Sequence, residues 1–295
     1  MGTVELPVVV GVDGSDAAFD ALDWAADMAT RRGLPLRIVH ASLWERYEGY
    51  IPSTSPDRPA ERIRSETVLA TAAERAGRRA SALKVMTDVA PDDPATALLR
   101  AGQSADAVVV GSRGRGEFAS LLLGSVGLGI AARAHCPVVV VRGRPENVRG
   151  RMGRVTVGIA ERERPAGGPE PACGAAATAF ALREARLRGC ELEAVHAWRY
   201  AGEEHGTPEE RARRAGELLE EALGGASAAA LAPVPVAHRV VEASPRKALL
   251  DASAHSDLLV VGARRRQGHF GMQLGLVNHA VLHHAQCPVA VVPQG

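Results

Sequence analysis

A glycine-rich stretch in the first half of the chain has the composition of a phosphate-binding loop. It begins with Gly-Ser-Arg-Gly from Gly111 to Gly114 and, after nine intervening residues, ends in Gly124 followed by Ser125. Glycines let the backbone approach a ligand closely, and the free N–H groups at a helix start attract anions. Ser125 adds a hydroxyl donor and Arg113 a charged one. The stretch therefore predicts a phosphate site, although glycines after a strand can also form a simple turn.

A carboxylate follows an apolar run near the N-terminus. Asp13 stands in the sequence Gly-Val-Asp-Gly-Ser-Asp, which runs from Gly11 to Asp16. Because a carboxylate repels phosphate groups, Asp13 is expected to accept hydrogen bonds from the sugar or base of a nucleotide. The alternative is an ordinary turn residue, with Ser15 or Asp16 as the N-cap of the next helix.

Other nucleotide and catalytic motifs are missing from the sequence. No segment matches the Walker A pattern, neither Lys84 nor Lys247 stands near a glycine run, and no G-x-G-x-x-G follows the first apolar run. We also find no nucleophile–base pair and no H-E-x-x-H metal motif. The pattern therefore favours nucleotide binding over catalysis.

Short β-branched runs alternate with amphipathic stretches and would position these loops. The predicted strands of the first half are 7–12, 36–41, 83–89, 107–111 and 138–142, and the predicted helices are 16–32, 60–81, 94–104 and 125–134. Near-continuous valine runs are typical of strands buried on both faces of a parallel sheet. Such sheets bind ligands at the carboxyl ends of their strands, which is where Asp13 and the glycine loop follow the first and fourth strands.

The chain contains this pattern twice. Asp-Ala-Val-Val-Val-Gly at 106–111 recurs as Asp-Leu-Leu-Val-Val-Gly at 257–262, and Cys-Pro-Val recurs at the same offset of 151 residues (257 − 106 and 287 − 136). The predicted strands of the second half are 154–159, 191–197, 234–241, 258–261 and 289–292. We predict two tandem domains, 1–143 and 153–295, joined by a polar linker that contains Gly and Pro.

Composition excludes several classes of protein. The 295 residues include 35 Lys and Arg against 34 Asp and Glu, so a net charge of +1 gives no basic surface for nucleic acid. No apolar run approaches the ~20 residues of a membrane span, and the N-terminus has no signal-peptide pattern. Four cysteines without a C-x-x-C pair predict a reduced, cytoplasmic protein.

Taken together, these motifs resemble the universal stress protein family in its ATP-binding form. The resemblance rests on Val-Gly-Val-Asp-Gly-Ser at 10–15, Val-His-Ala at 39–41, the glycine loop and Pro137, and it covers the whole chain as two copies. It implies two tandem α/β domains, each a doubly wound, five-stranded parallel sheet of the Rossmann-like, adenine nucleotide alpha hydrolase-like kind. It also implies ATP as the ligand, with Mg²⁺ carried by the phosphates.

The same resemblance implies particular contacts and partners. The nucleotide-binding residues it predicts are Gly11, Val12, Asp13, Ala41, Gly111, Arg113, Gly114, Gly124, Ser125 and Val126. Residues matching Val12 and Asp13 contact the adenosine end in ATP-binding members, and the glycine loop surrounds phosphates and ribose. Members commonly pair through the last strand, which implies a homodimer or a pairing of the two domains within the chain.

The second copy departs from the binding pattern. The positions that match Gly114, Ser125 and Asp13 hold Arg265, Leu276 and Ala160 respectively. A long cation, an apolar side chain and a methyl group replace a glycine, a hydroxyl and a carboxylate. We predict that the second domain binds ATP weakly or not at all, while the arginine run at 264–266 leaves another anion as an alternative.

The histidines have simpler expected roles. His40 and His196 end the second strand of each copy, where a strand-end hydrogen bond is expected. His279 and His283 are four residues apart on the last helix, but no third ligand accompanies them, so no metal site is predicted.

Three functions remain open from the sequence. The favoured one is a non-catalytic, nucleotide-dependent regulator of stress or dormancy that holds ATP mainly in the first domain. The alternatives are a slow Mg²⁺-dependent ATPase and a nucleotide-free dimerisation scaffold.

Overall fold

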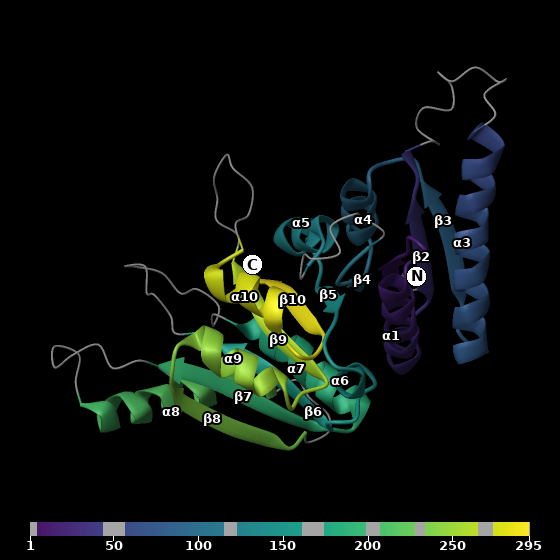
Figure 1. Ribbon diagram of the computed structural model, residues 1–295. Helices are drawn as coiled ribbons and strands as arrows, with labels where there is room; N and C mark the ends of the chain where they lie inside the picture. The colour runs from purple at the N-terminus through teal and green to yellow at the C-terminus, as the bar shows by residue number, and fades with distance from the viewer. Residues whose placement is uncertain are drawn as a thin grey trace. The chain divides into compact units, whose positions relative to one another are not determined.

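The computed structural model describes residues 5–43, 57–114, 123–160, 174–198, 207–227, 234–264 and 274–294. The chain divides into two compact units, Met1–Val141 and Arg142–Gly295, and both are drawn in Figure 1. Each unit is an α/β structure, as the sequence predicts.

The first unit is built on a parallel sheet in the order β3-β2-β1-β4-β5. Its strands are β1 (Val8–Gly11), β2 (Leu36–Ala41), β3 (Val85–Ala90), β4 (Ala107–Gly111) and β5 (Val138–Val141). The central strands are almost completely buried, and the valines of β1 have no exposed surface. Burial on both faces explains why these strands are continuous apolar runs rather than alternating ones.

Two pairs of helices cover the sheet of the first unit (Figure 1). The helices are α1 (Asp16–Arg32) beside α3 (Asp57–Arg79), and α4 (Pro94–Gly102) beside α5 (Ser125–Arg133). Local sequence sets the limits of α1, because Ser15 caps its start and Gly33, at φ +67°, ends it in the left-handed region. Two bidentate ion pairs, Arg75–Asp23 and Arg79–Asp27, join α3 to α1.

The second unit has the same topology, with strands in the order β8-β7-β6-β9-β10. Its strands are β6 (Arg154–Ile159), β7 (Glu191–Trp198), β8 (Val236–Glu242), β9 (Leu258–Arg264) and β10 (Val289–Gln294). Its helices are α6 (Pro145–Val148), α7 (Ala175–Arg188), α8 (Pro208–Ser227), α9 (Pro245–Ser253) and α10 (Leu276–His284). Within the described ranges, no helix of either unit is both long and apolar enough to cross a membrane.

The stretch expected to be a linker, 143–153, packs into the second unit. Asn147 is fully buried, and its amide donates to the carbonyl oxygens of Ala254 and Ser256 at 3.1 and 2.8 Å, just beyond the end of α9. The guanidinium of Arg142 donates to the carbonyl oxygen of Ala285 at 3.0 Å, at the end of α10. The segment is thus a structural part of the second unit, which begins at Arg142.

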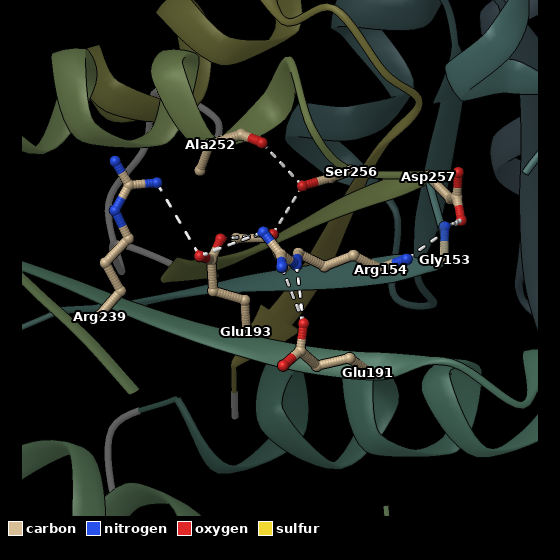
Figure 2. Close-up of polar contacts among 9 residues, drawn as sticks. Gly153, Arg154, Glu191, Glu193, Arg239, Ala252, Ser256 and Asp257 are labelled. Atoms are coloured by element: carbon tan, nitrogen blue, oxygen red, sulfur yellow. Dashed lines mark hydrogen bonds and ion pairs between the residues drawn. The ribbon is translucent and has the colours of Figure 1, made fainter. Parts of the chain in front are cut away.

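A polar network crosses β6, β7 and β8 in the second unit (Figure 2). Arg154 pairs with Glu191 at 2.9 Å, and buried Glu193 lies 3.7 Å from Arg154 and 3.9 Å from Arg239. In the first unit, Arg37 on β2 pairs with Asp88 on β3. The pairs Arg37–Asp88 and Glu193–Arg239 have the same register between the second and third strands of their sheets. The duplication has therefore kept this ion pair and reversed its charges.

Asp257 anchors the start of β6. Its carboxylate accepts hydrogen bonds from the backbone N–H groups of Met152, Gly153 and Arg154 at 2.7, 2.8 and 3.2 Å. Figure 2 shows Asp257 beside Gly153 and Arg154. The residue is 3% exposed, so its carboxylate is shielded from water. A buried carboxylate with three donors is strongly stabilised.

Replacing Asp257 with alanine is therefore expected to destabilise the second unit by about 3 kcal/mol, since three donors lose a charged acceptor. Chemical denaturation with peptide-level hydrogen exchange would measure the loss and assign it to this unit. Asp251→Ala, on the exposed side of α9, is the matched control. A loss as small as that of the control would contradict the anchoring role.

Candidate functional site

The strand order of the first unit places two loops side by side. β1 lies between β2 and β4, so the chain leaves β1 toward one side of the sheet and β4 toward the other. The two loops therefore start next to each other at the carboxyl ends of β1 and β4 and run to opposite faces of the sheet. Open α/β sheets bind ligands at such a switch point. The β1 loop contains Asp13, and the β4 loop contains Gly114.

Asp13 is held in place by its own loop. Its Oδ1 accepts hydrogen bonds from the N–H of Ser15 at 2.9 Å and from the hydroxyl of Ser15 at 2.6 Å. Gly14, at φ +80°, provides the sharp turn between the two residues. The carboxylate therefore has a defined orientation at the end of β1.

Gly114 brings the second loop against this carboxylate. A Cβ atom at Gly114 would lie 2.6 Å from Oδ2 of Asp13, closer than real contacts allow. Two residues about a hundred positions apart in the chain thus meet at one point. Glycine at this position leaves room for the carboxylate and keeps the backbone accessible, since Gly114 is exposed.

The N-terminus of α5 completes the site and has no side-chain cap. Gly124 is the N-cap residue, and its N–H donates to the carbonyl oxygen of Ser112 at 2.9 Å. A Cβ at Gly124 would be 3.8 Å from its nearest neighbour, so packing does not require glycine there. Ser125 follows it with an exposed side chain. An uncapped helix start with a free hydroxyl suits an anion.

Two of the predicted binding glycines also have a packing role. A Cβ at Gly111 would lie 2.5 Å from the carbonyl oxygen of Ala17, so this glycine lets β4 approach the first turn of α1. A Cβ at Gly11 would lie 2.8 Å from Leu98 on α4. Contacts of these glycines with a ligand remain a prediction, since packing alone accounts for both.

The remaining predicted residues lie around the same edge of the sheet. Val12 is buried, and its N–H donates to the carbonyl oxygen of Val39 at 2.9 Å. Ala41 ends β2 and is half-buried, as is Val126 in the first turn of α5, whereas Arg113 is exposed beside Gly114. Their contacts with a ligand also remain predictions.

Strand-end histidines tie the first two loops together in both units. Nδ1 of His40 is 2.8 Å from the carbonyl oxygen of Val12, and Nδ1 of His196 is 2.9 Å from that of Ile159. The predicted strand-end hydrogen bond is confirmed in both copies. It fixes the backbone immediately before Asp13 and before its counterpart Ala160.

The second unit has different groups at the corresponding place. Ala160 follows β6 without a carboxylate, and Leu276 at the start of α10 is 91% exposed. The amide of Asn278 donates to the carbonyl oxygen of Gly262 at 3.0 Å, and the side chain of Gln294 lies against Gly262. Arg265 is outside the described residues. The described part of this loop region thus contains an apolar helix start and side chains packed onto the β9 backbone.

Sequence reasoning missed Asn278 and Gln294. A signal was available for the first, because Asn278 stands at the offset of Gly127 (278 − 127 = 151). A Cβ at Gly127 would lie 3.9 Å from the carbonyl oxygen of Gly111, within reach of a longer side chain. The change from glycine to asparagine therefore puts an amide where the first unit has none.

Two histidines of α10 form a stack. The rings of His279 and His283 are stacked with centroids 4.4 Å apart. Burial, together with His279, His284 and Arg142, lowers the pKa of His283. Among the residues that the structure describes, no three His, Cys, Asp or Glu side chains could hold a metal ion together.

The topology defines each unit as a Rossmann-like α/β domain, with its switch point between β1 and β4 in the first unit and between β6 and β9 in the second. The family model for the universal stress protein family matches residues 6–142 and 169–293. The chain therefore belongs to the universal stress protein family, as a tandem member.

Relatives of similar length support this assignment. The chain is 36% identical over 300 residues to universal stress protein Rv2005c of Mycobacterium tuberculosis, covering 97% of each chain. It is 33% identical to a universal stress protein of Mycolicibacterium smegmatis, covering 98% of this chain and 97% of that one. The crystal structure of a universal stress protein from Archaeoglobus fulgidus has the same fold, with a TM-score of 0.70, 18% identity and coverage of 99% and 100%.

Proposed function

We propose that this protein is a nucleotide-dependent regulator that binds ATP in its first unit and does not catalyse a reaction. The observation that carries the proposal is the contact between the Asp13 carboxylate and Gly114, beside the uncapped start of α5. An acceptor for a sugar or base and a donor set for phosphates are thus adjacent. Adenine nucleotides contain all of these groups.

The charges indicate how the nucleotide would lie. The carboxylate of Asp13 would accept hydrogen bonds from ribose or adenine, near Val12 and Ala41 at the ends of β1 and β2. The phosphates would lie at the start of α5, where the N–H groups, the hydroxyl of Ser125 and the cation of Arg113 could bind them. Mg²⁺ would come with the phosphates.

The second unit is expected to contribute little to ATP binding. It has Ala160 where the first unit has a carboxylate and exposed Leu276 where the first unit has a hydroxyl. An apolar side chain at the helix start offers no hydrogen bond to a phosphate. We therefore expect about one ATP per chain.

The test starts from protein purified without added nucleotide. Nucleotide released on denaturation would be quantified, and the emptied protein would be titrated with Mg·ATP by calorimetry. We expect about one site per chain and at least roughly tenfold weaker binding by Asp13→Ala, which removes a charged acceptor. Two equal sites would refute the silent second unit. No binding at all would refute the proposal and favour the scaffold.

Two further parts of the proposal concern assembly and location. We infer a cytoplasmic protein that pairs through its last strands, either as a homodimer or within one chain. Sedimentation of the protein with and without Mg·ATP would give its mass in solution, and a monomer at all concentrations would refute the homodimer.

A further inference from the structure

We propose that Ser15 is a positioning residue for the nucleotide, which acts through the carboxylate of Asp13. The inference rests on the proposed function, because it concerns the same site. It goes further by giving Ser15, which also caps α1, a role in nucleotide affinity.

The hydrogen bonds of Ser15 favour this role. Its N–H and its hydroxyl both donate to Oδ1 of Asp13, at 2.9 and 2.6 Å. An O–H···O⁻ distance of about 2.6 Å is typical of a strong, charge-assisted bond. Two donors on one oxygen fix the rotation of the carboxylate, and they leave Oδ2 directed at Gly114.

The cap of α1 is the weaker of the two hydroxyl interactions. The hydroxyl oxygen accepts the N–H of Ala18 at 3.3 Å, while its proton is given to Asp13 at 2.6 Å. A hydroxyl can donate once and accept twice, so both bonds can exist together. The short contact is the one to Asp13, which a cap alone does not require.

The consequence is a carboxylate that is oriented before the nucleotide arrives. A side chain that is already fixed loses less conformational freedom on binding. Without the hydroxyl, Asp13 would lose the shorter of the two hydrogen bonds that Ser15 donates to it, and its Oδ2 would be less tightly held against Gly114. The affinity for the nucleoside part of ATP would then fall.

Calorimetric titration with Mg·ATP tests the role, at a temperature well below unfolding. We expect Ser15→Ala to weaken binding about tenfold, the loss of one hydrogen bond to a charged group. Ser15→Thr keeps the hydroxyl and is expected to bind like the wild type. Ser244→Ala is the matched control, because Ser244 caps α9 of the second unit in the same way, accepting the N–H of Lys247 at 3.4 Å.

A double-mutant cycle with Asp13→Ala separates positioning from a merely structural role. If Ser15 acts through Asp13, adding Ser15→Ala to Asp13→Ala weakens binding no further. The inference would be overturned, with the proposed function left intact, if the double variant lost affinity by the product of the two single losses. It would also be overturned if Ser15→Ala bound Mg·ATP with wild-type affinity. If Asp13→Ala binds as tightly as the wild type, or if the wild type binds no ATP, the proposed function fails and this inference fails with it.

Discussion

Replacing Gly114 with arginine is expected to weaken Mg·ATP binding at least roughly a hundredfold, a loss of about 2.7 kcal/mol. The first atom of the new side chain would lie 2.6 Å from Oδ2 of Asp13, so carboxylate or loop must move. The guanidinium would then pair with the carboxylate that we assign to the nucleoside. The substitution also copies the second unit, where Arg265 stands at the matching position.

Calorimetric titration would measure this loss, with Gly77→Arg as the matched control. Gly77 is an exposed residue of α3 with no atom within 4 Å of its would-be Cβ. The control adds the same charge and the same side chain to the same unit, and it is expected to bind ATP normally. Wild-type affinity of Gly114→Arg would show that the nucleotide does not bind between Asp13 and the glycine loop.

The fold could be predicted wherever local chemistry marks the ends of an element. The predicted helix at 16–32 matches α1 because Ser15 caps its start and Gly33 ends it. The third strand was expected at 83–89 and lies at Val85–Ala90. Its residues are half-buried or exposed, Met86 among them, so hydrophobicity gives no sharp boundary there.

Part of the candidate site could also be predicted from the sequence. The rule that ligands bind at carboxyl ends of parallel strands predicts that Asp13 and the glycine loop meet, and the structure brings Asp13 and Gly114 into contact. The role of each glycine was not accessible. Both positions are glycine in the sequence, yet a Cβ would meet a fixed backbone carbonyl at Gly111 and the movable end of a side chain at Gly114.

The packing of polar residues could not be predicted from the sequence. The segment at 143–153 has the composition of a linker, and nothing in its hydropathy shows that Asn147 is fully buried. The asparagine is tolerated inside because its amide binds carbonyl oxygens beyond the end of α9. The reversed ion pair is also hidden in the sequence, since only the pairing of the strands shows that Arg37 meets Asp88 and Glu193 meets Arg239.

Substitution of Gly143 by alanine is expected to destabilise the second unit by about 4 kcal/mol, through left-handed backbone strain together with overpacking. Gly143 has φ +102°, which L-residues rarely adopt. A Cβ there would lie 2.2 Å from the carbonyl oxygen of Gln286 and 2.6 Å from the nitrogen of Cys287. Both atoms belong to the backbone that leads into β10, so no side-chain rotation can relieve the collision.

Moving that backbone would disturb contacts on either side of it. The carbonyl oxygen of Gln286 accepts the N–H of Arg144 at 2.9 Å, and the N–H of Gln286 donates to the hydroxyl of Ser253 at 3.0 Å.

Gly150→Ala is the matched control, because Gly150 also has a positive φ of +72° but has no atom within 4 Å of a would-be Cβ. The control carries only backbone strain and is expected to cost about 1 kcal/mol. Scanning calorimetry, with hydrogen exchange to assign the unit that opens, would compare the two variants. Equal losses would mean that segment 143–153 is not packed against the start of β10.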